Sequence, residues 1–388
     1  MRDFVNLTNL HIWDGSRTVD ADTIQMHQGA ITFVGARANT PSGGSFQDCA
    51  GLTAIPGLID AHVHLELNPD DKSPPERTLP NVIPLMAERA KSMVAAGITT
   101  ARDLGGGAWY ELVLRNDIAD GKLVGPRLLC SGQPITTPQG HCHFWGGGAA
   151  NQAAALAVLH QQVSKGVDLI KIMATGGRMT RGSQPTATQF SQSTMNALVA
   201  AAHAHNLPVA AHCHGTAGIH QAALAGVQTI EHCSWVGQQG WASDYQDSVA
   251  QIILDNGVWV SPTVNKGWQR MLERRDGKVL ARIRAAYRKM LTMGIPMVAS
   301  TDAGIPGVYH ADLPHALVVF AKIAELSPAQ TLISATSNAA RALGIEQICG
   351  KLAVGLAADI LLLDGNPLQD LSNLTRPAQV YCQGYAVL

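Results

Sequence analysis

The middle of the chain alternates between short apolar runs and longer stretches of helical periodicity. In the longer stretches, apolar residues recur at the three- and four-residue spacing of an amphipathic helix, and many of them end at Gly or Asn. The short runs, typical of buried strands, lie at residues 58–65, 98–105, 127–132, 168–177, 207–214, 229–234, 258–264 and 296–304. Eight strand–helix units predict an α/β fold, a closed parallel (β/α)8 TIM barrel.

The two ends of the chain have a different pattern. They contain short alternating or apolar runs that are separated by Asp-Gly, Gln-Gly and Pro-Gly turns, which is typical of β-structure. These runs lie at residues 4–15, 23–36, 52–58, 350–365 and 379–388. We therefore predict a small β-sandwich domain from residues 1–54 and 350–388, and a barrel domain from residues 55–349.

The 388-residue chain is 46% hydrophobic and 15% charged, with a formal net charge of -1. This composition gives no basis for binding nucleic acid or an anionic membrane. No apolar run approaches the ~20 residues that span a membrane, and the N-terminus lacks a basic segment followed by an apolar one. Seven scattered cysteines favour a reducing compartment, so we expect a cytoplasmic protein. The low charge for this length leads us to expect a homo-oligomer.

Ligand-type side chains stand at the ends of the predicted strands, where such barrels carry their active sites. His62 and His64 are two residues apart in one strand, so both imidazoles can face one metal ion. Lys171 is flanked by apolar residues, and because an unpaired buried ammonium is costly, it needs a partner or a changed chemical state. The other strand-end residues are Arg102, Asp103, His141, His143, His212, His214, His232 and Asp302.

Three expectations follow from these positions alone. Arg102 and Asp103 are expected to form a structural pair near the barrel mouth. His212 and His214 share one side of their strand, so either could be a metal ligand. Cys213 lies between them, points the opposite way and is expected to be a small packing residue.

Around these residues the chain resembles the amidohydrolase superfamily of metal-dependent (β/α)8 barrels. It is most similar to the imidazolonepropionase-like branch, which includes Xaa-Pro and Xaa-Arg/Lys dipeptidases. The matching stretches run across nearly the whole chain: PGLIDAHVHL, GITTARDLGG, GHCHF, IKIMATGG, PVAAHCHG, AGVQTIEHC, STDAG, SNAARALG and LAADILLLDGNP. The resemblance implies two divalent metal ions, with zinc as the expected metal.

The resemblance also implies which residues hold the metals. His62 and His64 resemble the ligands of the more buried metal, and His212 and His232 resemble those of the second. Lys171 resembles the lysine that reacts with carbon dioxide to form a carbamate, which bridges the two metals. A carbamylated Lys171 would answer the burial problem, because an amine becomes an anion between two cations.

The same resemblance assigns the chemistry. Asp302 resembles the residue that contacts the first metal and acts as general acid and base. His141 resembles the histidine that polarises the scissile carbonyl, and His143 is the alternative because the motif holds both. The expected reaction is hydrolysis of an amide bond, in a dipeptide or an N-acyl amino acid, by metal-activated hydroxide.

Two other functions remain open. The first is hydrolysis of a cyclic amide, or deamination, of a small heterocycle. Gly215 stands where deaminases of the superfamily often have a glutamate, and those enzymes usually lack the lysine found here as Lys171; both facts weigh against a deaminase. The second is an inactive homologue kept for assembly, which the filled ligand positions weigh against.

Substrate contacts are expected from the loops. Arg178 and Arg181 follow Lys171 and could pair bidentately with a substrate carboxylate, or could simply be solvated. His214 is expected to face the substrate, and Tyr309, close after Asp302, to line the pocket. The expected substrate is thus a small molecule or a short peptide.

Overall fold

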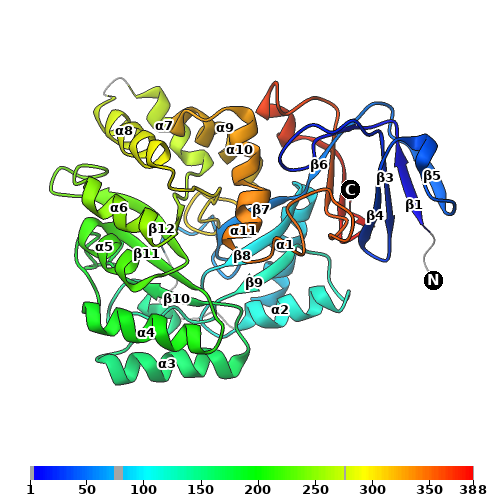
Figure 1. The fold of residues 1–388 in the computed structure, drawn as a ribbon. Helices are drawn as coiled ribbons and strands as arrows, with labels where there is room; N and C mark the ends of the chain where they lie inside the picture. The colour runs from blue at the N-terminus through cyan, green and yellow to red at the C-terminus, as the bar shows by residue number, and fades with distance from the viewer. Residues whose placement is uncertain (1–3, 74–81, 275–276, 388) are drawn as a thin grey trace.

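Parallel strands form the centre of the structure, a computed structural model that describes residues 4–73, 82–274 and 277–387 (Figure 1). One sheet has the order β7-β8-β9, and another the order β10-β11-β12-β13. Every neighbouring pair in both sheets is parallel. The strands are β7 (Leu58–Val63), β8 (Ile98–Asp103), β9 (Arg127–Cys130), β10 (Ile170–Met173), β11 (Val209–Gly215), β12 (Thr229–Val236) and β13 (Trp259–Ser261). These seven strands coincide with the first seven predicted runs.

The eighth predicted run, residues 296–304, is not a regular strand. It makes isolated parallel bridges instead, from Met297 to Val260 of β13 and from Ala303 to Val63 of β7. A third parallel bridge, between Ile135 and Ile172, joins the segment after β9 to β10. These bridges connect the two parallel sheets to each other and, through residues 296–304, connect β13 to β7.

Helices connect the strands, and Figure 1 shows α3 to α6 on the outer side of β10 to β12. The side chains of Asn151 and Ser191 cap the starts of α3 and α4. Glycines in the left-handed conformation end α3, α5 and α8, as the Gly-terminated patterns predicted. The α-helices are α1 (Ile83–Ala95), α2 (Tyr110–Ala119), α3 (Gln152–Lys165), α4 (Gln192–Ala204), α5 (Thr216–Ala225), α6 (Asp247–Asp255), α7 (Gln269–Glu273), α8 (Lys278–Met293), α9 (Leu313–Ala324), α10 (Pro328–Ser334) and α11 (Ser337–Ala342). The short 3-10 helices are η1 (Arg37–Asn39), η2 (His143–Trp145), η3 (Lys266–Trp268) and η4 (Leu371–Thr375).

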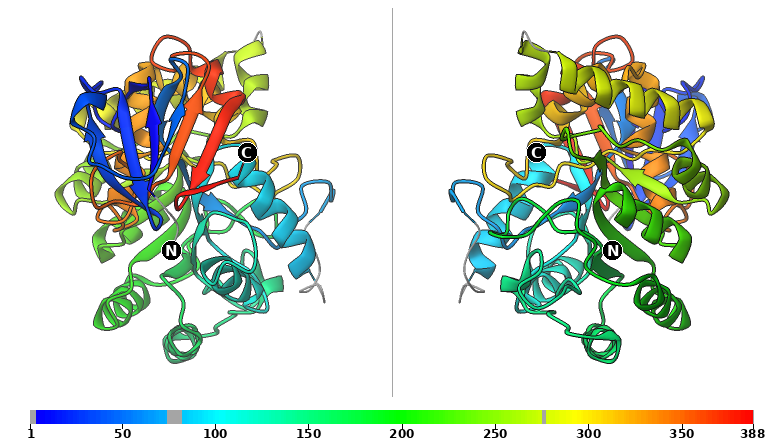
Figure 2. Two further views of the ribbon diagram at one scale, coloured as in Figure 1. Left: turned by 90° about the vertical axis from the view of Figure 1, so that its right-hand side faces the viewer. Right: turned by 90° about the vertical axis from the view of Figure 1, so that its left-hand side faces the viewer.

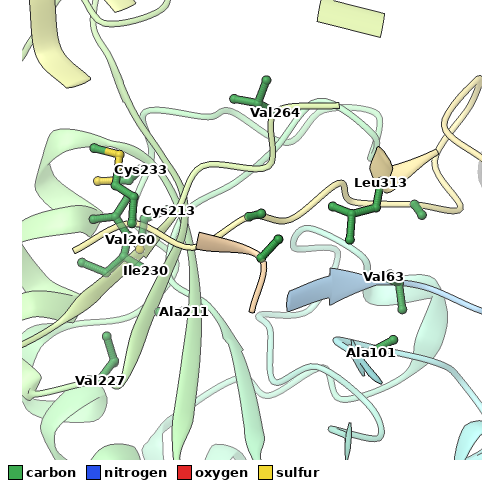
Figure 3. Close-up of a cluster of buried hydrophobic side chains, with 14 of the residues drawn as sticks. Val63, Ala101, Ala211, Cys213, Val227, Ile230, Cys233, Val260, Val264 and Leu313 are labelled. Carbon is green, nitrogen blue, oxygen red and sulfur yellow. The ribbon is translucent and has the colours of Figure 1, made fainter. Parts of the chain in front are cut away.

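A large apolar core packs the parallel strands against the helices. Figure 3 shows part of it, with Ala211, Ile230 and Val260 from three adjacent strands. Cys213 and Cys233 belong to the same buried cluster, which confirms that Cys213 is a packing residue. All seven cysteines of the chain are buried and free.

Both ends of the chain meet in two further sheets, seen face-on in Figure 2 (left). One has the order β4-β3-β1-β5 and the other the order β16-β15-β14-β6-β2. One apolar cluster takes side chains from both sheets, among them Leu7, Ile24, Ile360 and Leu362. The strands are β1 (Val5–Thr8), β2 (His11–Ile12), β3 (Thr23–His27), β4 (Ala30–Gly35), β5 (Ser45–Asp48), β6 (Thr53–Pro56), β14 (Ile360–Leu363), β15 (Pro377–Cys382) and β16 (Tyr385–Ala386).

Candidate metal centre

The predicted metal-ligating residues share one cavity of about 560 Å³. They come from β7 and the residue that follows it, from β10, β11 and β12, and from residues 296–304. Most are buried, although the carboxylate of Asp302 keeps 15% of its surface exposed. The cavity is lined by all six of them: His62, His64, Lys171, His212, His232 and Asp302.

Three of these side chains converge on one point. Nε2 of His62 lies 3.3 Å from Nε2 of His64, and Oδ1 of Asp302 lies 3.3 Å from each of these nitrogens. Zinc bonds of ~2.0–2.1 Å in a tetrahedron separate two ligand atoms by about 3.3–3.4 Å. The spacing of these three atoms therefore fits a small divalent cation.

Each of the four histidines predicted as metal ligands has one ring nitrogen within hydrogen-bonding distance of a neighbouring protein group. Nδ1 of His64 lies 3.2 Å from the carbonyl oxygen of Gly105, and Nε2 of His212 lies 3.2 Å from that of Gly176. Nδ1 of His232 lies 2.8 Å from a threonine hydroxyl, Oγ1 of Thr263. Outer partners of this kind fix the ring and leave the other nitrogen for a metal.

His62 has a charged outer partner, Glu231. Oε2 of this carboxylate lies 2.9 Å from Nδ1 of His62, and Oε1 accepts a hydrogen bond of 2.7 Å from Arg102. Glu231 is fully buried, so its charge depends on these two neighbours. Glu231 immediately precedes His232, yet no sequence pattern predicted its role.

The expected pairing of Arg102 with Asp103 is wrong. Successive strand residues point to opposite sides, and Arg102 reaches across the strands to Glu231. Asp103 instead accepts hydrogen bonds from the backbone N–H groups of Leu65 and Gly105. It thereby holds Leu65, which follows His64, and Gly105, whose carbonyl oxygen lies next to Nδ1 of His64.

Lys171 is a buried amine with no hydrogen-bond partner among the described residues. Only 1% of its surface is exposed. Burial lowers its pKa and favours the neutral amine, which is the form that reacts with carbon dioxide. An orphaned amine among metal-ligand side chains fits a lysine that is modified or that meets a cation.

Buried imidazoles dominate the rest of the cluster. Ligand atoms of His62, His232 and Asp302 lie within 4.8 Å of one another, and so do those of His212, His214 and His232. Burial is the main cause that lowers the pKa of His62 to about 4, so its ring is neutral at neutral pH, as metal ligation requires. The His/Asp cluster could therefore hold a divalent metal ion.

Asp302 is held in an unusual backbone conformation. Its φ of 62° lies in the left-handed region, which a non-glycine residue adopts only when its surroundings enforce it. The buried carboxylate of Asp60 accepts hydrogen bonds from the backbone N–H and the hydroxyl of Thr301, next to Asp302. The backbone N–H of Asp302 donates to the carbonyl oxygen of His62 at 2.8 Å. These contacts aim the carboxylate at the two histidines.

His141 lines the same cavity, on the side of His212. Its Nδ1 is buried and has no hydrogen-bond partner in the described part of the chain. Its ring lies against Gly177, where an added Cβ would come within 2.4 Å of Cε1 and Nε2. Only glycine at this position leaves room for the ring, so Gly177 belongs to the site, although no sequence pattern predicted it.

The outer wall of the cavity combines one arginine with aromatic and apolar side chains. The guanidinium of Arg178 lies 5.3 Å from the ring centre of Trp241. That indole meets the His214 ring edge-on, with ring centres 5.0 Å apart. Trp268 and Met271 also line this wall. Trp241, which the sequence analysis did not single out, thus connects the arginine to the histidine cluster.

Three predicted substrate contacts lie outside this cavity. His143 is exposed, with Nδ1 3.0 Å from the carbonyl oxygen of Gly140. Arg181 is exposed and lines an outer hollow that shares Arg178 with the cavity. Tyr309 is 48% exposed, and its hydroxyl donates to Asp70.

The chain is similar to known proteins in both sequence and structure. Residues 53–387 match the amidohydrolase family. The ochratoxinase of Aspergillus niger is 27% identical over an alignment of 392 residues, which covers 90% of this chain and 78% of that protein. The imidazolonepropionase of Xanthomonas oryzae pv. oryzae is 24% identical over 388 residues, covering 92% of this chain and 90% of that protein. A crystal structure of a Xaa-Pro dipeptidase with methionine bound in its active site has a TM-score of 0.84 at 25% identity, covering 99% of each chain.

Among the described residues, none of the helices has both the length and the apolar composition needed to cross a membrane.

Proposed function

The chain belongs to the amidohydrolase family, hydrolases that act on amide bonds, and from this premise we propose that it is a binuclear metal-dependent hydrolase of a dipeptide or an N-acyl amino acid. The observation that carries the proposal is the convergence of His62, His64 and Asp302 at 3.3 Å beside an orphaned lysine amine. Zinc is the proposed metal, because imidazole and carboxylate ligands at this spacing suit it.

Six residues would hold the two cations. His62, His64 and Asp302 would bind the first, and His212 and His232 the second. Lys171 would bridge both as its carbamate, which removes the cost of an unpartnered buried amine. When bound, the cations would supply Lewis-acid polarisation of the scissile carbonyl and a more acidic water.

The proton steps would belong to Asp302. Burial raises the pKa of the Asp302 carboxyl, but the neighbouring imidazoles outweigh it and hold this pKa well below its usual range. Asp302 is therefore a carboxylate that can accept a proton. Asp302 would take the proton from the attacking water and deliver it to the leaving nitrogen. His141 would donate a hydrogen bond to the carbonyl oxygen as negative charge develops on it.

The outer wall indicates which part of the substrate lies where. Arg178 would pair with the free carboxylate of the released amino acid, because guanidinium matches carboxylate bidentately. A substrate between Arg178 and the histidine cluster would lie along Trp241. Trp268 and Met271 would then face its side chain, which favours a large apolar residue at the C-terminal position.

The arrangement of the strands supports two domains. We infer that the circuit of parallel strands, with residues 296–304 as an irregular eighth member, is a (β/α)8 barrel formed by residues 55–349. The apolar cluster shared by the two terminal sheets supports a β-sandwich formed by residues 1–54 and 350–388.

A product assay tests the function. Zinc-loaded protein, with bicarbonate present, is mixed with pooled dipeptides and N-acyl amino acids, and free amino acids are measured by mass spectrometry. We expect release of large apolar C-terminal residues. No release by protein that carries two zinc ions per chain would contradict the proposal, and would favour a cyclic amide, a substrate class suggested by the imidazolonepropionase relative.

A further inference from the structure

Three imidazoles, more than the proposed function uses, surround the position of the second cation. The ring centre of His212 lies 4.6 Å from that of His214 and 4.5 Å from that of His232. The ring centres of His214 and His232 are 4.6 Å apart, and the two rings are nearly stacked. All three are buried, and their ligand atoms lie within 4.8 Å of one another.

The backbone departs from regular strand geometry at this point. The register between β11 and β12 shifts between Cys213 and Gly215, on either side of His214. On β12, His232 (φ 67°) and Cys233 (φ 46°) adopt the left-handed conformation. Irregularities of this kind re-aim side chains at the ends of strands, and their backbone strain is kept where the surroundings require it. Here the irregular backbone turns imidazoles from two strands toward one another.

His214 is oriented in the same way as its two neighbours. Its Nδ1 lies 3.0 Å from Oγ of Ser234, and its backbone N–H donates to Oγ1 of Thr175. Since Nδ1 is held by an outer partner, Nε2 is the nitrogen left for a ligand, as with Nδ1 of His212 and Nε2 of His232. Each ring of the trio therefore has one anchored and one available nitrogen.

We propose that His214 completes, with His212 and His232, a three-imidazole site for one divalent cation. This inference rests on the proposed function and adds a ligand to it. Three protein imidazoles with one open position are a ligand set that zinc uses in catalytic sites. Because the set is complete without Lys171, this cation binds whether or not the lysine carries a carbamate.

The test measures cation binding in the full-length protein, without reference to turnover. Purified chains are stripped of metal with a chelator, kept free of bicarbonate and titrated with Co²⁺ or Zn²⁺. Binding is followed by calorimetry and by the visible absorption of Co²⁺. Four proteins are compared: wild type, Lys171→Ala, Lys171→Ala with His214→Ala, and Lys171→Ala with His203→Ala, in which the exposed imidazole of α4 is removed as the matched control.

We expect Lys171→Ala to keep two cations per chain and the added His214→Ala to remove one, with a changed Co²⁺ spectrum. The His203→Ala control should match its Lys171→Ala parent. Ser234→Ala provides a second variant that leaves the ring in place. Loss of the Ser234 hydroxyl should weaken the binding of the same cation by ~10–100-fold, the usual effect of removing an outer partner.

Two results separate this inference from the proposed function. Equal cation number and affinity with and without His214, in chains that remain folded by circular dichroism, would overturn the three-imidazole site alone. A wild-type chain that binds no divalent cation would overturn the proposed function together with it.

Discussion

Nδ1 of His62 lies 2.9 Å from Oε2 of Glu231, a carboxylate that is 169 residues away in the sequence. The other oxygen of Glu231 accepts from Arg102, so one buried anion both orients an imidazole and neutralises a buried cation. The proposed metal centre and the stability of the core would therefore depend on the same side chain.

Glu231→Gln should weaken the binding of the first cation by ~10–100-fold, because the imidazole of His62 loses its charged partner. The metal-free protein should also become less stable, by about 3–5 kcal/mol, because Arg102 is left as a buried, unpaired charge. Metal titration and thermal unfolding measure the two effects. Glu325→Gln, which removes an exposed carboxylate from a surface ion pair, is the control and should change neither. Unchanged metal affinity would contradict the role of Glu231.

Gly177→Ala should lower kcat by displacing His141, whose ring occupies the space of the new methyl group. His141→Ala itself should lower kcat by ~10²–10³, the usual cost of one oxyanion donor. In the His141→Ala background, Gly177→Ala should have no further effect, which a double-mutant cycle measures. Additive losses would show that Gly177 acts on something other than His141.

Asp302→Asn should lower kcat by ~10²–10⁴ because the amide cannot accept the proton of the attacking water. The amide has nearly the same shape, so the protein should still fold and keep its cations. Turnover and metal content are measured on the same preparation. A wild-type rate would refute the assignment of Asp302 as the general base.

Lys171→Ala should lower kcat/KM by more than the ~10–100-fold caused by loss of an outer partner. A short carboxylic acid such as acetate or propionate should restore part of the activity, since it can occupy the space of the lost carbamate. Chloride at the same ionic strength is the control. Equal rates in both salts would argue against a bridging anion at this position.

Arg178→Met should lower kcat/KM for substrates with a free carboxylate by about 10–100-fold, corresponding to a charge-assisted hydrogen bond of about 1.5–3 kcal/mol. For the corresponding C-terminal amides the variant and the wild type should differ little. Arg181→Met removes the neighbouring arginine from outside the cavity and is the matched control. An equal loss for acids and amides would mean that Arg178 shapes the wall and does not bind the carboxylate.

A local rule was sufficient to predict that His62 and His64 would lie together. Strand alternation placed His62 and His64 on one side, and both line the cavity. The same rule could not find Glu231, because its significance comes from a contact with His62 across the sheet. A Glu next to a strand-end His is a signal only when its partner strand is known.

The loops were harder to predict. His143 and Arg181 have the right chemistry and lie close to site residues in sequence, yet both are exposed outside the cavity. Their positions depend on turns that no apolar periodicity specifies. Trp241 is the reverse case, because it belongs to no motif, yet it reaches the cavity from the connection between β12 and α6.

The sheet shared by the two ends of the chain has a consequence for synthesis on the ribosome. Strand β6 pairs with β14, and only Gly57 separates β6 from β7, the strand that carries His62. Residues 57–359, most of the chain, are translated after β6 and before its partner. Until then β6 exposes an unpaired edge next to β7, and such edges are prone to aggregation. Chaperone dependence should therefore be greatest in nascent chains that end before residue 360.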